Sequence, residues 1–125
     1  MVRRPFIVFQ LLALCAVLLP PVTALQLVPQ PTSRLFAVYV ANDESGQMLV
    51  TSSPDGVNWS PDVVIPHTTH MPVAATLFRN RIYVGYVASD GSGQLLITSS
   101  ADGVHWSPDT VLPHTTRMPL AMAVF

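Results

Sequence analysis

Lysine is absent from the 125-residue chain, and only 10% of its residues are charged. Its six basic residues are all arginine, against seven acidic residues, so the formal net charge is −1. A nucleic-acid-binding protein needs clustered positive charge to neutralise phosphates, so we expect no nucleic-acid partner. Half of the residues are hydrophobic, which together with the low net charge argues against an intrinsically disordered chain. This length predicts one domain at most.

The first 24 residues, 1–24, have the pattern of a signal peptide for secretion. Arg3 and Arg4 precede an apolar run from Phe6 to Leu19, and small residues then lead to Ala24. The run has 14 residues, whereas a membrane-spanning helix needs about 20. We therefore expect cleavage after Ala24, a secreted protein in the periplasm or outside the cell, and no stable membrane anchor. An uncleaved anchor is the alternative.

Cysteine is missing from the expected mature chain, residues 25–125, because the only cysteine is Cys15. Disulfides therefore cannot hold the mature fold, although an exported protein would be free to form them. Four arginines against seven acidic residues give the mature chain a formal charge of −3. Its stability must come from the burial of apolar surface, and a chain of this size has little to spare.

After a linker at 25–33, the mature chain is a tandem repeat. Residues 34–78 align without a gap with residues 81–125, at an offset of 47 and with 28 identities in 45 positions. Each unit contains four candidate strands, and Asp-Gly turns between them favour hairpins. In the first unit we expect strands at 35–41, 47–53, 57–65 and 71–78. In the second unit we expect them at 81–89, 94–100, 104–112 and 118–125, with loops at 66–70 and 113–117 before the last strand of each unit.

Four short strands in a repeat of this length are what one blade of a β-propeller requires. A sheet of this kind has apolar residues on both faces and cannot hide them alone, but stacked blades cover one another. The pattern therefore predicts an all-β fold of two four-stranded propeller blades. A small sandwich or meander made from duplicated halves is the structural alternative.

Each unit also carries a turn motif, SPDGVNW at 53–59 and SADGVHW at 100–106. These segments resemble the Asp-box, or bacterial neuraminidase repeat (BNR), of sialidase-like propellers, which runs Ser-x-Asp-x-Gly-x-Thr-Trp. Asp and Gly are adjacent here, so the motif is one residue shorter, and Asn58 or His105 replaces the threonine. The resemblance covers nearly all of residues 34–125 and implies blades of the sialidase type.

Physical reasoning gives the motif residues structural roles. The carboxylate can accept backbone N–H groups across the turn, the serine hydroxyl can bond nearby backbone, and the tryptophan can bury its ring between sheets and find a partner for its N–H. The resemblance implies that these turns lie on the face away from the ligand. We expect no catalytic residue among them, and structural roles for Ser53, Asp55, Gly56, Trp59, Ser100, Asp102, Gly103 and Trp106.

By the same resemblance, the ligand face carries the loops 66–70 and 113–117 and the turns 42–46 and 89–93. Their imidazole, hydroxyl and carboxylate groups suit sugar hydroxyls, which both donate and accept hydrogen bonds. The candidate ligand-binding residues are His67, Thr68, His70, His114, Thr115, Arg117, Asp43 and Asp90. We expect no metal or other cofactor, because His67 and His70 lack a third ligand and Arg117 replaces His70 in the second unit.

These features predict a secreted, non-catalytic, carbohydrate-binding module that takes glycans as partners. Two alternatives remain: a fragment of an exo-sialidase-like glycoside hydrolase, and a structural protein-interaction repeat. The resemblance implies that a sialidase needs an arginine cluster and a tyrosine nucleophile with an acidic partner. The mature chain has four arginines and only one glutamate, Glu44. We therefore expect that the protein is not an enzyme. If it is one, we expect it to be a sialidase-like glycoside hydrolase.

Two blades cannot close into a ring. If each fourth strand is the innermost strand of the next blade, then 35–41 is an edge without a partner and 118–125 needs a partner. A homo-oligomer of three copies joined head to tail would form a six-bladed ring. The alternative is that the chain is a fragment of a longer propeller.

Overall fold

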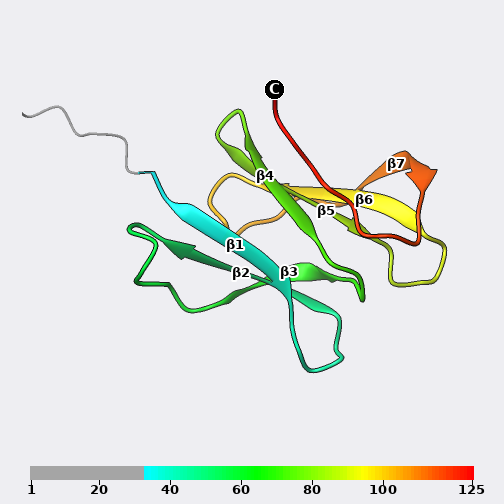
Figure 1. Cartoon of the computed structure of the whole chain (residues 1–125), viewed down its shortest axis with the longest axis horizontal. Coiled ribbons are helices and arrows are strands. Elements are labelled where there is room, and N and C mark those ends of the chain that lie inside the picture. The colour runs from blue at the N-terminus through cyan, green and yellow to red at the C-terminus, as the bar shows by residue number, and fades with distance from the viewer. Residues whose placement is uncertain (1–32) are drawn as a thin grey trace, which may run out of the picture. The chain divides into compact units, whose positions relative to one another are not determined.

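The computed structural model describes residues 33–125, which form seven antiparallel strands and no helix (Figure 1). The strands are β1 (Leu35–Val40), β2 (Gln47–Ser53), β3 (Val63–Thr68), β4 (Ala74–Phe78), β5 (Arg81–Val87), β6 (Gln94–Ser100) and β7 (Thr110–Thr115). The expected all-β class is confirmed for these residues, and none of them belongs to a helix that could cross a bilayer. The predicted signal peptide and nearly all of the linker lie outside the described residues.

The strands form two sheets, in the orders β1-β2-β3 and β4-β5-β6-β7. The predicted fourth strand of the first unit therefore joins the second sheet, and the expectation of one four-stranded sheet from each unit is wrong for the first unit. This strand pairs with β5, with Phe78 opposite Arg81. The tight hairpin between them uses Arg79 and Asn80, which both have positive φ, as a two-residue turn between twisted strands requires. The two sheets consequently have three and four strands.

The third strand of each unit starts later than the sequence predicts. Residues 57–62 and 104–109 form turn and irregular backbone, and β3 and β7 begin after them. In compensation, Pro66 and Pro113, predicted in loops, lie inside β3 and β7. A proline has no N–H to donate, and it is tolerated here because both strands are edge strands.

The expected strand at 118–125 is also wrong, because these residues form no strand (red in Figure 1). They have no neighbouring strand among the described residues to share hydrogen bonds with. The segment instead packs against the second sheet above Gly85 in β5. A Cβ at Gly85 would lie only 2.8 Å from both Leu120 Cδ1 and Met122 Sδ. Glycine is therefore the residue that lets this segment approach the backbone of β5.

The hydrophobic core lies between one face of the first sheet and one face of the second. Alternate residues of β2 and β5 point into it, as the two-residue period of a strand dictates. Its buried members are Met48, Val50 and Ile65 from the first sheet and Ile82, Val84 and Tyr86 from the second. Each is at most 3% exposed, and burial of such side chains stabilises a fold by about 1.5–3 kcal/mol each.

Candidate binding cleft between the two sheets

Three polar side chains from both sheets meet beside this core. His67 of β3 places its Nδ1 3.2 Å from Oδ2 of Asp109, which lies immediately before β7. The hydroxyl of Tyr86 in β5 donates a 2.5 Å hydrogen bond to Oδ1 of the same carboxylate. The other imidazole nitrogen, Nε2, is 3.2 Å from the carbonyl oxygen of Ser107. The network therefore fixes the histidine of one sheet onto the other.

The electrostatics make Tyr86 a fixed hydrogen-bond donor. Burial raises the pKa of its hydroxyl, and the hydrogen bond to the Asp109 carboxylate raises it further. The side chain is only 1% exposed. A nucleophile needs the opposite, a lowered pKa and access to substrate. Tyr86 therefore supports the neighbouring imidazole and carboxylate rather than attacking a ligand.

A cleft of about 310 Å³ opens beside this network. The Thr68 and Ser89 hydroxyls, one from each sheet, lie 3.4 Å apart and exposed. Asp90 accepts hydrogen bonds from Ser92, which lower its pKa and keep it charged. The full lining is Pro66, His67, Thr68, Tyr86, Ala88, Ser89, Asp90, Leu96 and Asp109. It combines hydroxyl, carboxylate and imidazole groups with a small apolar floor.

The structure divides the predicted ligand-binding residues among three places. His67, Thr68 and Asp90 line this cleft. His70 and Arg117 line a second cleft, of about 340 Å³, which shares Ser89 with the first. The remaining candidates, His114, Thr115 and Asp43, line neither cleft.

Sequence reasoning missed both Asp109 and its hydrogen-bond partner Tyr86. A signal was available in the repeat, because Tyr39 and Asp62 of the first unit recur as Tyr86 and Asp109 of the second. A buried polar atom needs a partner, so two polar residues that both repeat are candidates for a hydrogen-bonded pair. The pairing with His67 crosses from one sheet to the other, and no local pattern indicates it.

The turns at 53–59 and 100–106, called Asp-box turns for their resemblance alone, follow β2 and β6 and have an internal structural role. In each turn, one carboxylate oxygen of Asp55 or Asp102 accepts two backbone N–H groups at 2.8 Å. The serine hydroxyl, fully buried, accepts the glycine N–H at 2.8 Å. Gly56 and Gly103 have φ near +79° and +78°, a conformation that glycine adopts without strain.

These bonds lower the pKa of both carboxylates. For Asp55 the backbone N–H of Asn58 has the largest effect, and for Asp102 the side chain of His105 does. The carboxylates are therefore committed to their own turns.

The two motif tryptophans differ from the expectation and from each other. Trp106 packs against the core, and its Nε1 is buried without a hydrogen-bond partner among the described residues. Trp59, its counterpart, is 44% exposed. Trp106 thus lacks the expected N–H partner, and Trp59 lacks the expected burial. The physical reason is that a neighbouring sheet covers only the second motif.

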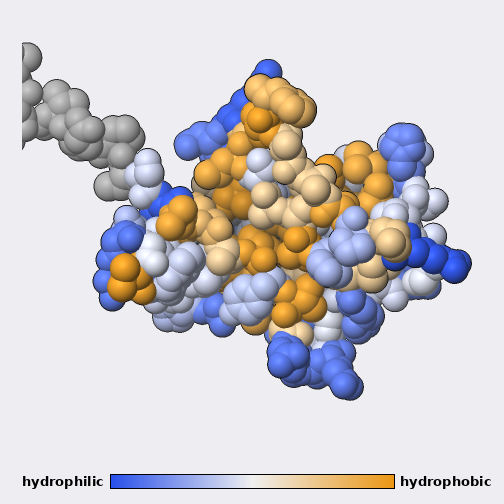
Figure 2. Space-filling model, in the orientation of Figure 1, coloured by the Kyte–Doolittle hydropathy of each residue, from blue (hydrophilic) through white to orange (hydrophobic). Residues whose placement is uncertain are grey.

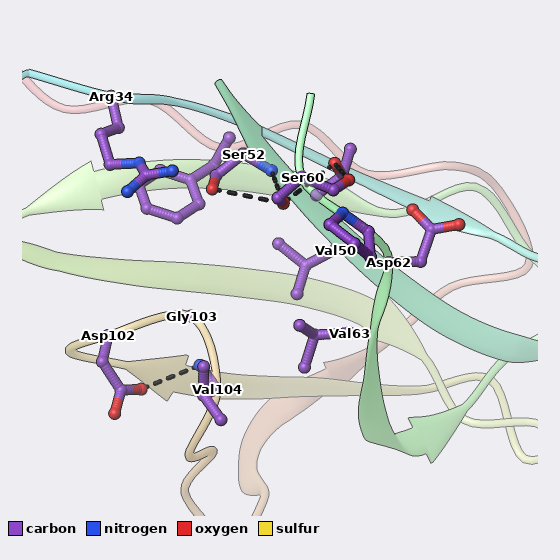
Figure 3. Close-up of a pocket in the computed structure, with 12 residues that line it drawn as sticks. Arg34, Val50, Ser52, Ser60, Asp62, Val63, Asp102, Gly103 and Val104 are labelled. Atoms are coloured by element: carbon purple, nitrogen blue, oxygen red, sulfur yellow. Dashed lines mark hydrogen bonds between the residues drawn. The ribbon is translucent and has the colours of Figure 1, made fainter. Parts of the chain in front are cut away.

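A third hollow, of about 370 Å³, lies between the first sheet and the second Asp-box turn. Figure 3 shows Val50 and Val63 directed toward it, with Arg34 at one end and Asp62 at the other. The Asp102 carboxylate borders it but is occupied by the Val104 N–H. This hollow therefore offers fewer free polar groups than the cleft beside His67.

Among residues 33–125, no group of three His, Cys, Asp or Glu side chains is placed to hold a metal ion. Comparisons with known proteins give no match to any protein-family model, curated protein or solved structure. The case for function therefore depends on the cleft itself.

Proposed function

We propose that this protein is a secreted, non-catalytic binding module for carbohydrates, built from blades of the sialidase-like, Asp-box type. The observation that carries the proposal is the cleft between the sheets, where Thr68, Ser89 and Asp90 converge on the imidazole of His67. Hydroxyl groups donate and accept equally well, and a carboxylate accepts, which matches the mixed hydrogen bonding of sugar hydroxyls. The volume of the cleft is at the small end of known ligand sites and suits one or two sugar rings.

Hydrolysis is disfavoured by the same geometry. Tyr86 is the tyrosine of the cleft with an acidic neighbour, yet it is buried and its pKa is raised. The Arg117 side chain belongs to the neighbouring cleft, and Arg81 donates to the Ser99 hydroxyl at 3.1 Å within its own sheet. The arginine cluster that a sialidase uses on its substrate carboxylate is therefore not gathered at His67.

A glycan array tests the proposal, followed by calorimetric titration of the best binder. Thr68→Val and Ser89→Ala remove one cleft hydroxyl each, and neither hydroxyl is buried. We expect each to weaken binding about 5- to 30-fold, the usual effect of one lost hydrogen bond of about 1–2 kcal/mol. Unchanged affinity in both variants would place the ligand elsewhere.

The matched control is His105→Asn, at the other end of β6. It gives the second Asp-box turn the residue of the first turn, where Asn58 bonds the Asp55 carboxylate at 2.7 Å. We expect no change in glycan affinity. A fluorogenic sialoside assay on the same preparation separates the alternatives, because turnover would favour the hydrolase and an empty glycan array would favour a protein-interaction repeat.

Secretion has a separate test that does not involve the ligand. The full chain is expressed in a host with a general secretion pathway, and the N-terminus of the exported protein is sequenced. We expect it to begin at Leu25, because the small residues before Ala24 fit a cleavage site. A protein retained in the cytosol with its full N-terminus would contradict export.

A further inference from the structure

Two surfaces of the described residues are partly open to solvent although they repeat surfaces that are buried inside the molecule. We define the head face as the face of the first sheet that carries Leu35, Ala37 and Tyr39. With the offset of 47, its counterparts are the core residues Ile82, Val84 and Tyr86. The tail face is the face of the second sheet that carries Leu95, Ile97 and Leu112, whose counterparts are Met48, Val50 and Ile65.

The same residue positions are therefore buried in one unit and less buried in the other, where Leu35 and Tyr39 are exposed and the remaining four residues are half-buried. Leu35 is 57% exposed, whereas Ile82 is 3% exposed, and Tyr39 is 39% exposed, whereas Tyr86 is 1% exposed. Inside the molecule, a surface of the head type packs on a surface of the tail type to form the core. The free head and tail faces are complementary for the same reason, since the repeat supplies both halves of the contact.

The C-terminal segment, residues 118–125, lies where an innermost strand of a further sheet would lie. In the first unit, Val38 and Val73 line one hollow between β1 and the chain that leads into β4. Their counterparts Gly85 and Leu120 are in direct contact. Figure 2 shows hydrophobic residues at the surface around β4 and along this segment. Val124 and Phe125 are among the exposed large hydrophobic residues.

The repeat also fixes which strand this segment would pair with. β4 pairs with β5, with Ala74 opposite Gly85 and Phe78 opposite Arg81. Adding the offset of 47 to the β4 residues and subtracting it from their β5 partners places residues 121–125 opposite residues 38–34, at the start of β1. Among the described residues, β1 pairs only with β2 and has a free edge. A free apolar edge favours the addition of a strand.

The polar network of His67, Tyr86 and Asp109 is also formed only once among the described residues, although its residues occur in both units. His67 of the first unit contacts Asp109 of the second. The counterpart histidine, His114, is exposed on β7, and the counterpart carboxylate, Asp62, faces Tyr39, whose pKa it raises through a hydrogen bond. Each chain thus carries one half of a second network at each end.

From these three coincidences we infer that a second copy of this chain binds head to tail. The head face of one copy covers the tail face of the other, and residues 121–125 of one copy add to the free edge of β1 of the other. His114 of one copy then meets Asp62 and Tyr39 of the next. Because the contact joins two different surfaces, successive copies form a ring only if the rotation between them closes, and a closed ring of three copies would contain six sheets.

Two matched variants test this contact. Leu35→Arg introduces a charge on the head face. Val64→Arg introduces the same charge on β3, where Val64 is 48% exposed. Its counterpart Val111 is still 52% exposed although the two sheets of the chain are in contact. An equivalent contact between copies should therefore leave Val64 exposed as well. Both positions are exposed in a single copy, so only an assembly should distinguish them.

The readout is the mass of the purified full chain by size-exclusion chromatography with light scattering. We expect wild type and Val64→Arg at about three times the mass of one chain, and Leu35→Arg at the mass of one chain. A wild-type protein that is folded and monomeric would overturn the inference, and so would an oligomer that Leu35→Arg leaves intact. Circular dichroism verifies the fold, and Tyr39→Arg replaces Leu35→Arg if that variant unfolds.

A mixing experiment tests whether the contact is head to tail. Leu112→Arg disables the tail face, as Leu35→Arg disables the head face, and each variant alone should be monomeric. Mixed together, each retains one intact face, so we expect a one-to-one pair at about twice the mass of a chain and nothing larger. Two monomers that remain separate would contradict the head-to-tail contact.

A consequence for ligand binding depends additionally on the proposed function. The residues equivalent to the His67 cleft are His114 and Thr115 of one copy with Asp43 of the next. Titration with the array-selected glycan should therefore give about two sites per chain in the oligomer and about one in Leu35→Arg. One site per chain in both proteins would refute only the second cleft. No binding in either protein would refute the proposed function. The mass measurement tests the assembly independently of both.

Discussion

The two repeat units are nearly the same sequence in two different surroundings. They share 28 of 45 residues, and their Asp-box turns have the same hydrogen bonds at the same distances. Yet Thr98 is fully buried, while its counterpart Thr51 is only partly buried. Local backbone structure therefore follows from local sequence, whereas burial depends on whether another sheet lies alongside.

At one site where the two units differ in sequence, the differences compensate one another in volume. The first unit has Val38 beside a chain that carries Val73 and Ala75. The second unit has Gly85 at the position of Val38, with Leu120 and Met122 at the other two positions. Lost volume on the strand is replaced by added volume on the segment that crosses it, which keeps the packing dense.

The largest expected difference between the units is in the loss of stability when the equivalent tyrosine of each unit is replaced by alanine. Tyr86→Ala should lower the free energy of unfolding by about 3–5 kcal/mol, because it empties a buried aromatic site. It also leaves the Asp109 carboxylate without its donor. Tyr39→Ala should cost less than about 1 kcal/mol. Urea unfolding in the Leu35→Arg background, where no second copy contributes, measures both, and equal losses would show that burial does not distinguish the units.

A smaller effect is expected at Gly85. Gly85→Val forces a side chain against Leu120 and Met122, whose flexible ends are 2.8 Å from the new Cβ. We expect a loss of about 1–3 kcal/mol. Adding Leu120→Val and Met122→Ala, which transplants the residues of the first unit, should restore most of that loss. Thermal unfolding measures both proteins, and a triple variant no more stable than the single one would refute volume compensation.

The Asp-box turns should give the fold a shared sensitivity to acid. The pKa values of Asp55 and Asp102 are lower in the folded chain than in the unfolded one. Their stabilising effect is therefore complete above the ordinary Asp pKa of about 3.9 and is lost as the pH falls below it. Asp55→Asn with Asp102→Asn should unfold more readily at pH 7 and depend less on pH below about 4, as urea midpoints against pH will show.

The smallest effect is expected in the turn between the first two strands of each unit. Glu44 has a φ of 64°, and its counterpart Gly91 has a φ of 80°. Residues with a side chain pay about 1 kcal/mol in this region. Glu44→Gly should therefore stabilise the chain by up to about 1 kcal/mol and Gly91→Glu should destabilise it by a similar amount. Calorimetry on the pair tests the prediction, since opposite signs are required.

The parts of the fold that the sequence predicts are those with local causes. The hairpin strands β1, β2, β5 and β6 fall close to their expected ranges, because period-two patterning and Asp-Gly turns act over a few residues. The third strands were misplaced because Pro66 and Pro113 suggested loops. The assignment of β4 to the second sheet depends on its pairing with Arg81–Val87. The pattern of residues within β4 does not indicate which strand it pairs with.

The candidate site was only partly predictable for a related reason. Loop composition indicates His67, Thr68 and Asp90, which do meet in one cleft. The same composition indicates His114 and Thr115 equally, although they line neither the cleft beside His67 nor the cleft beside Arg117. Asp109 is recognisable only once the two sheets are placed, because its contact with His67 spans 42 positions of sequence.

The prolines in the outermost strands limit where the molecule can grow. Pro66 and Pro113 lie in the middle of β3 and β7, and each of these strands forms one rim of its sheet. A strand without that N–H is a poor template for a neighbour, so the rim resists the amyloid-like stacking to which a protein with so few charges is otherwise prone.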